Sequence, residues 1–89
     1  KSLPKGFSSM SQLEELYLRS NDIDIFPEEV LDCNNLSIID LSLNNITTLP
    51  ESVSSMKNLQ KINLVGNPLS KKTIKFIKSE LSHLTVYYD

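Results

Sequence analysis

Apolar residues recur along this chain with a period of 23 residues. Segment 36–58, LSIIDLSLNNITTLPESVSSMKN, shows the repeating unit most clearly. Shifting it by 23 residues in either direction places apolar residues on apolar residues. A unit this short cannot bury a core of its own, so successive units must stack on one another. The pattern therefore predicts a repeat array.

The first nine residues of each unit have the pattern of a short strand. Apolar residues occupy the first, fourth and sixth places of LEELYLRSN, LSIIDLSLN and LQKINLVGN, which begin at Leu13, Leu36 and Leu59. Because the fourth and sixth places are two residues apart, their side chains lie on one side of an extended strand, toward the core. Strands this short must pair side by side, which predicts a parallel sheet with one strand per unit.

An asparagine closes each of these strand segments: Asn21, Asn44 and Asn67. Its side-chain amide can bond backbone groups of the turn and of the next unit, and a buried amide is stable only when it is fully hydrogen-bonded. The three positions therefore predict an inward-facing asparagine ladder.

The second half of each unit returns the chain to the next strand and contains a proline at one fixed place, namely Pro4, Pro27 and Pro50. Proline restricts the preceding residue to extended geometry. Two apolar residues spaced by three then follow, as in Val53 and Met56, and this spacing predicts one or two turns of short helix or 3-10 helix. Since strands and helical turns differ in width, the stack should curve with its sheet on the concave side.

The C-terminal part departs from the repeat and is typical of a closing unit. Residues Lys71 to Leu81 place apolar side chains on one face of an amphipathic helix. Leu84 and Val86 then take the fourth and sixth places of a final strand, predicted over 84–88. The expected single domain, 1–89, thus divides into a partial unit 1–12, units 13–35 and 36–58, a modified unit with a capping helix 59–80, and a terminal strand segment 81–89.

The pattern LxxLxLxxNxIxxLPxxIxxLxx resembles the leucine-rich repeats of the 23-residue class, and the resemblance covers nearly the whole chain. It implies an α/β fold: a short, right-handed, curved solenoid with a parallel sheet on the concave face and short helices or 3-10 turns on the convex face. A C-terminal capping helix and a final strand complete the expected fold. The chain is similar to intracellular signalling arrays and to small bacterial proteins of this family. This similarity implies a protein-binding scaffold, and the lack of cysteine-rich flanking caps favours a cytoplasmic location.

Composition and charge narrow the possible partners. No apolar run approaches the roughly 20 residues needed to cross a bilayer, so we expect no membrane insertion. Cys33 is the single cysteine, which excludes an internal disulfide framework and a zinc site built on several thiolates. The net charge of -2 hides an asymmetry, with three basic and nine acidic residues in 1–56 but six lysines and two acidic residues in 57–89. Such a gradient can orient a partner, although ordinary solvated surfaces also account for it.

Residues that could carry chemistry have simpler interpretations. His83 is expected to be exposed in the third place of the last strand, and Cys33 occupies a place that is apolar in the other units. Neither Gly6 nor Gly66 belongs to a phosphate-binding loop. A solvated helix face accounts for the lysines of 71–78 better than a nucleic-acid site does. We therefore expect no enzyme activity, catalytic residue, cofactor or metal site, and no nucleic-acid partner.

The concave sheet face is the expected binding surface, and its partner is expected to be another protein. Equivalent strand positions form rows with neighbours about 4.8 Å apart. In the last strand, His83, Thr85 and Tyr87 are predicted to continue the rows of Lys61, Asn63 and Val65. Tyrosine and arginine are enriched at interface anchors. The predicted protein-binding residues are Glu15, Tyr17, Arg19, Ile38, Asp40, Ser42, Lys61, Asn63, Val65 and Tyr87, with Asp40 near the centre and Leu43 beside them.

Two other roles remain open from the sequence. The array could be the recognition segment of a larger enzyme, such as a ubiquitin ligase, kinase or GTPase, whose catalytic domain lies outside this chain. It could also be a structural element, because the N-terminus shows no cap comparable to the C-terminal helix and strand. An uncapped edge can drive self-association, and we expect the natural protein to continue upstream of it.

Overall fold

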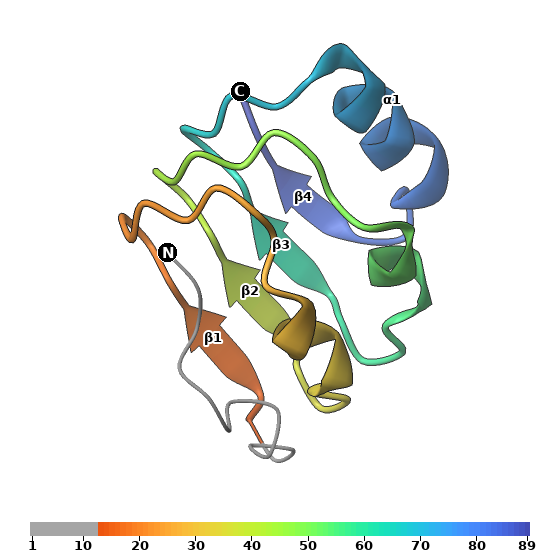
Figure 1. Ribbon diagram of the computed structural model, residues 1–89. Coiled ribbons are helices and arrows are strands. Elements are labelled where there is room, and N and C mark those ends of the chain that lie inside the picture. Colours follow the sequence, from red (N-terminus) through yellow and green to blue (C-terminus); the bar gives the residue numbers. More distant parts are fainter. Residues whose placement is uncertain (1–12) are drawn as a thin grey trace.

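The computed structural model describes residues 13–89 of the chain. In this part, the elements in order are β1 (Glu15–Tyr17), the 3-10 helix η2 (Glu28–Asp32), β2 (Ile38–Asp40), the 3-10 helix η3 (Glu51–Ser55), β3 (Lys61–Asn63), α1 (Lys71–Glu80) and β4 (Thr85–Tyr87). Within the same residues the strands form one sheet in the order β1-β2-β3-β4, and every adjacent pair is parallel (Figure 1). The expected partial unit 1–12 and the N-terminal edge lie outside the described residues.

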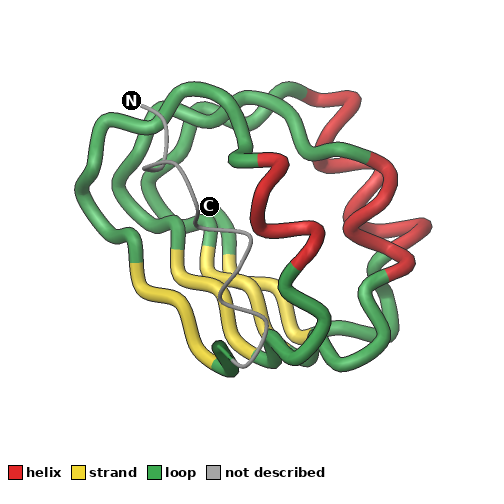
Figure 2. Tube along the Cα trace, turned by 60° about the horizontal axis from the view of Figure 1, so that its bottom comes forward, coloured by secondary structure: helices red, strands yellow, loops and turns green. Residues whose placement is uncertain are grey.

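The strands and the helices form two separate layers. Figure 2 shows the strands on one side of the molecule and η2, η3 and α1 on the other, joined by loops at both ends of each strand. This arrangement confirms the predicted α/β solenoid, in which each unit contributes one strand and one helical segment. The return segments after Pro27 and Pro50 form 3-10 helices, as the spacing of apolar residues predicts.

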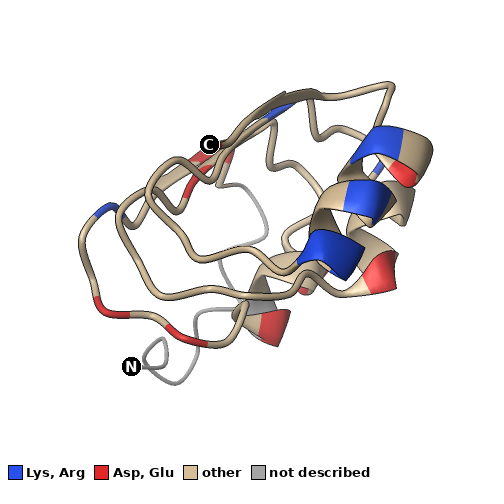
Figure 3. Ribbon diagram, turned by 90° about the horizontal axis from the view of Figure 1, so that it is seen from above, with Lys and Arg blue, Asp and Glu red and all other residues tan. Residues whose placement is uncertain are grey.

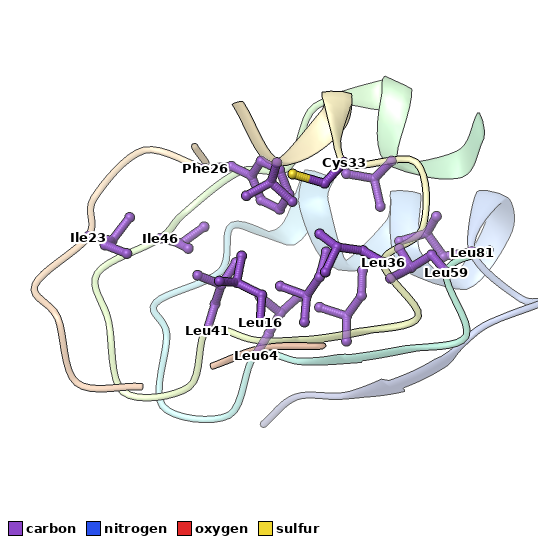
Figure 4. Close-up of a cluster of buried hydrophobic side chains, with 14 of the residues drawn as sticks. Leu16, Ile23, Phe26, Cys33, Leu36, Leu41, Ile46, Leu59, Leu64 and Leu81 are labelled. Carbon is purple, nitrogen blue, oxygen red and sulfur yellow. The ribbon is translucent and has the colours of Figure 1, made fainter. Parts of the chain in front are cut away.

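The core lies between these layers and consists of the residues that the repeat pattern places inward. The fourth-place residues Leu16, Ile39 and Ile62 are 7%, 0% and 0% exposed, while their neighbours on β1 to β3 are exposed or half-buried. Cys33 is fully buried among apolar side chains, as expected from its place in the unit (Figure 4). Burial of apolar side chains stabilises such an array by about 25 cal/mol per Å² of surface removed from water.

The side chain of Asn44 joins two neighbouring units. Its Oδ1 accepts hydrogen bonds from the backbone N–H of Asn21 at 2.9 Å and of Ile23 at 3.0 Å. Its Nδ2 donates to the carbonyl oxygens of Leu18 at 3.0 Å and Leu41 at 2.9 Å. One amide therefore satisfies backbone groups of its own turn and of the preceding turn, groups that would otherwise be buried without partners.

Asn67 repeats this arrangement one unit later. Its Oδ1 accepts from the backbone N–H of Ile46 at 2.9 Å, and its Nδ2 donates to the carbonyl oxygens of Leu41 and Leu64 at 2.8 and 3.1 Å. The predicted inward ladder is confirmed for Asn44 and Asn67, which are buried. It is wrong for Asn21, whose side chain is exposed, because β1 is the outermost strand of the described residues.

The residue before each asparagine has a left-handed backbone conformation. Ser20, Leu43 and Gly66 have φ values of 59°, 56° and 79°. A non-glycine residue in this conformation costs roughly 1 kcal/mol. Gly66 therefore adopts it without strain, whereas the backbone of Leu43 is strained. A Cβ atom on Gly66 would lie 2.5 Å from Cδ2 of Leu43. The turns that leave successive strands thus stack closely on one another.

The capping helix α1 begins at a well-formed N-cap. The Oγ of Ser70 accepts from the backbone N–H of Thr73 at 3.1 Å, which satisfies a donor of the first helical turn. Thr73 is buried, and its Oγ1 donates to the carbonyl oxygen of Thr47 at 2.8 Å. The bond to Thr47 fastens α1 to the loop before η3. Of the predicted core positions of this helix, Ile77 and Leu81 are buried and Ile74 is half-buried.

The register of β4 differs from the prediction. Ile62 pairs with Val86, and Lys61 and Asn63 pair with Thr85 and Tyr87. The last strand therefore enters the sheet two residues later than expected, because α1 and the turn that follows it use two more residues. A shift of two keeps every side chain on its expected face. It moves Val86 to the fourth place, which the sequence had assigned to Leu84.

Replacing Asn44 with alanine should lower the free energy of unfolding by about 3 kcal/mol, because several buried backbone groups lose their partners at once. Urea denaturation followed by circular dichroism measures this loss. Asn21→Ala is the matched control: its side chain is exposed and its backbone N–H still bonds to Asn44, so the loss should stay below about 1 kcal/mol. Equal losses in the two variants would contradict the bridging role of Asn44.

Replacing Gly66 with alanine should cost about 1–2 kcal/mol, from the left-handed backbone and from the clash with Leu43. In a Leu43→Ala background the cost should fall, since the Cδ2 atom that the new methyl group meets is gone. A double-mutant cycle in urea measures the difference. If Gly66→Ala costs the same in both backgrounds, the turns do not stack as described.

Candidate functional site

The outer face of the sheet presents two rows of side chains across the strands. The third places form one row and the fifth places form the other, with neighbours about 4.8 Å apart. We call these residues the sheet face. The third-place row is Glu15, Ile38, Lys61 and Thr85, and the fifth-place row is Tyr17, Asp40, Asn63 and Tyr87.

A shallow hollow of about 270 Å³ lies in the middle of the sheet face. Tyr17 on β1 and Tyr87 on β4 stand at its two ends and are 59% and 47% exposed. The half-buried Ile38 and Asp40 of β2 lie between them. The residues that line the hollow are Tyr17, Ile38, Ile39, Asp40, Lys61, Asn63 and Tyr87.

The hydroxyl group of Tyr17 donates a hydrogen bond of 2.8 Å to Oε1 of Glu15. This bond raises the pKa of Tyr17 above 10.0, and desolvation and the charges of Glu15 and Asp40 add to the rise. The phenol is therefore neutral and hydrogen-bonded at physiological pH. Its ring is held in one direction at the β1 end of the hollow.

Asp40 and Asn63, adjacent in the fifth-place row, both support the turn that leaves their strand. Oδ1 of Asp40 accepts from the backbone N–H of Ser42 at 3.0 Å and from its Oγ at 2.7 Å. Oδ1 of Asn63 accepts from the backbone N–H of Val65 at 3.1 Å. Among the described residues Oδ2 of Asp40 has no such partner, so this carboxylate holds the turn with one oxygen and offers the other to the hollow.

Lys61 gives the β3 side of the hollow a positive charge. Its Nζ lies 5.9 Å from the centre of the Tyr87 ring, within the range of a cation–π contact. Asp40 and Lys61 therefore place opposite charges on neighbouring strands. A partner that crosses the sheet meets a negative group over β2 and a positive group over β3.

The structure brings together six of the predicted binding residues and sets the others apart. Tyr17, Ile38, Asp40, Lys61, Asn63 and Tyr87 line the hollow. Glu15 supports Tyr17 from the neighbouring row position, and Arg19 and Val65 are exposed beyond the ends of β1 and β3. Ser42 is only 1% exposed because its hydroxyl turns back to Asp40, so the expectation that it is open to contact is wrong.

The shifted register of β4 changes two further expectations. Tyr87 stands beside Asn63, in the same row as Tyr17, and not beside Val65 as predicted. His83 lies in the turn before β4, so its predicted place in that strand is wrong. The sequence thus predicted that both tyrosines lie on the sheet face but not that they frame one hollow, since strand alternation cannot distinguish registers two residues apart.

The described residues carry little that suggests catalysis. In 13–89 no three His, Cys, Asp or Glu side chains gather as a metal site would require. Burial raises the pKa of the Cys33 thiol, and nearby Asp32 adds to the rise, so this cysteine is a poor nucleophile. No helix in this part of the chain has both the length and the apolar character needed to span a bilayer.

Comparison with known proteins identifies the repeat. The family model described as "Leucine rich repeat" matches residues 11–69. A solved leucine-rich repeat protein of Leptospira interrogans matches with a TM-score of 0.86 and 32% sequence identity, over 97% of this chain and 22% of that protein. No curated protein matches the chain. The chain thus spans about a fifth of the length of the solved structure that it resembles.

Replacing Glu15 with alanine should lower the pKa of Tyr17 toward 10.0, because the hydrogen bond and the nearby negative charge are both removed. In the unchanged protein this bond is intact at neutral pH and is lost as the pH rises through the raised pKa of Tyr17. NMR of the tyrosine ring carbons against pH measures the shift. Glu14→Ala is the control and should leave the titration of Tyr17 unchanged; an unchanged titration in Glu15→Ala would contradict the contact.

Proposed function

Because the chain belongs to the leucine-rich repeat family, we propose that it is a non-catalytic protein-binding module that holds its partner on the sheet face. The observation that carries this proposal is the hollow between Tyr17 and Tyr87. Aromatic residues at the edges of a depression bury large apolar areas on binding at little conformational cost. The sheet face offers two such residues on a framework of paired strands.

The other residues of the hollow suit recognition of a protein surface. Ile38 supplies an apolar floor, and Asp40 and Lys61 supply charges of opposite sign on adjacent strands. Charges placed in this way fix the orientation of a partner more than they raise its affinity. The proposed partner therefore places an apolar side chain over Ile38, with a basic group toward Asp40 and an acidic group toward Lys61.

The setting in which this module works is also a proposal. Intracellular signalling or scaffolding in the cytoplasm would suit a repeat array of this kind. The sheet face would act in the same way if the chain were the recognition segment of a larger enzyme, since the hollow needs only residues of β1 to β4.

Combining Tyr17→Ala, Asp40→Asn and Tyr87→Ala should reduce capture of the partner from a cell extract about tenfold or more, measured by affinity capture with quantitative mass spectrometry. Asparagine at position 40 keeps the oxygen that accepts from Ser42, so the turn after β2 stays intact. Circular dichroism and thermal unfolding verify that the variant is folded.

Ser52→Ala, Ser55→Ala and Lys57→Ala together form the matched control, because these residues are exposed and lie on the return half of the unit. A partner that binds the sheet face is retained by the unchanged protein and by this control, and is lost by the sheet-face variant. Equal retention by all three proteins would refute binding through the sheet face.

A further inference from the structure

A second and larger depression lies on the helical side of the molecule. It is a groove of about 730 Å³ between η3 and α1, so it is built from elements that the sheet face does not use. Figures 1 and 2 show these two elements next to each other on the side away from the strands. The residues that line the groove are Thr48, Leu49, Glu51, Ser54, Lys72, Thr73, Lys75, Phe76, Ser79 and Glu80.

Hydrogen bonds to one loop fix the two walls of this groove relative to each other. The backbone N–H of Ser70 and the Oγ1 of Thr73 both donate to the carbonyl oxygen of Thr47, at 3.0 and 2.8 Å. Thr47 is followed directly by Thr48 and Leu49, which line the groove. The groove is therefore formed before any ligand arrives, which reduces the entropy lost on binding.

The base of the groove is apolar, and the wall formed by α1 carries two lysines and one glutamate. Leu49 and Phe76 are half-buried apolar side chains that pack against the core, and both line the groove. Lys72 and Lys75 are exposed and line the groove together with Phe76. Lys72 lies three residues before Lys75 and four before Phe76, spacings that place neighbouring side chains on one face of α1. An apolar side chain and flanking acidic groups complement this surface.

The charge of α1 favours acidic ligands more broadly. Its ten residues include Lys71, Lys72, Lys75 and Lys78 but a single acidic residue, Glu80. Figure 3 shows several Lys and Arg positions on the helical segments, with acidic positions also among them. Lys71 and Lys78 are exposed but do not line the groove. The groove thus uses two of the four lysines, which makes its contribution separable by experiment.

We propose that this groove binds a short acidic peptide segment of a partner protein, with an aromatic or aliphatic side chain packed against Leu49 and Phe76. Carboxylates on either side of that anchor pair with Lys72 and Lys75. Glu51 and Glu80 also line the groove and repel negative charge at their positions. The ligand is therefore acidic only near its anchor, unlike a nucleic acid or an anionic membrane, whose charge is continuous.

The experiment begins with a random peptide library displayed on phage and selected on the folded protein. The selected peptides should share one large apolar residue flanked by aspartate or glutamate. A synthetic peptide of that consensus then serves as the probe, and its affinity is measured by fluorescence anisotropy at physiological salt. A consensus without acidic residues, or no consensus, overturns the proposal.

Two double variants with the same net charge locate the binding site. Lys72→Glu with Lys75→Glu should weaken binding of the consensus peptide about tenfold or more, whereas Lys71→Glu with Lys78→Glu should change it less than about threefold. If both double variants weakened peptide binding equally, the peptide would be attracted to the helix as a whole, and binding in the groove would be refuted. If the first variant is unfolded by circular dichroism, Lys72→Gln with Lys75→Gln replaces it.

Two further measurements separate this site from other surfaces. Tyr17→Ala with Tyr87→Ala should leave peptide binding unchanged, so a failure of the sheet-face proposal does not affect this one. Heparin and vesicles containing phosphatidylserine should compete weakly with the peptide. If heparin or the vesicles competed as strongly as the unlabelled peptide does, the site would be one for polyanions or membranes, and the proposal would be overturned.

Discussion

The hydrogen bonds of the buried asparagines are the interaction on which this fold depends. Each strand of β1 to β4 contains three residues, too few to hold a unit in place by sheet pairing alone. The chain must turn sharply after each strand, and that turn would bury backbone groups without partners. Asn44 and Asn67 satisfy these groups and join each turn to the preceding one. The units therefore stack for two reasons: stacking gives the backbone groups of the turns their hydrogen-bond partners, and it buries apolar side chains.

The same constraint shapes the surface that faces a partner. Asp40 and Asn63 stabilise the turns after β2 and β3 with one side-chain oxygen each, so residues of the sheet face are also part of the framework. Their positions are consequently fixed before binding. This coupling explains why a substitution at position 40 must retain an acceptor if it is to report on recognition and not on stability.

The two sides of the molecule differ in chemistry because they are built from different halves of the unit. The sheet face takes alternate residues from each strand, which yields rows of mixed aromatic, apolar and charged side chains. The helical side ends in α1, an amphipathic helix whose solvent-facing positions are rich in lysine. A single chain of 89 residues can thus present two surfaces with distinct preferences.

The sequence alone determined the repeat, the inward positions such as Ile39 and Ile62, the asparagine turns and the capping helix, because each follows from local periodicity or from the chemistry of one residue type. Only the tertiary structure decided what depends on neighbours in space. The predicted register of β4 was wrong by two residues, because a shift of two preserves the alternation of faces, and this shift placed Tyr87 in the row of Tyr17. Ser42 is buried and its hydroxyl bonds to the Asp40 carboxylate, and the groove exists because α1 packs beside η3. These features depend on how separate segments come together, which no periodicity within the chain specifies.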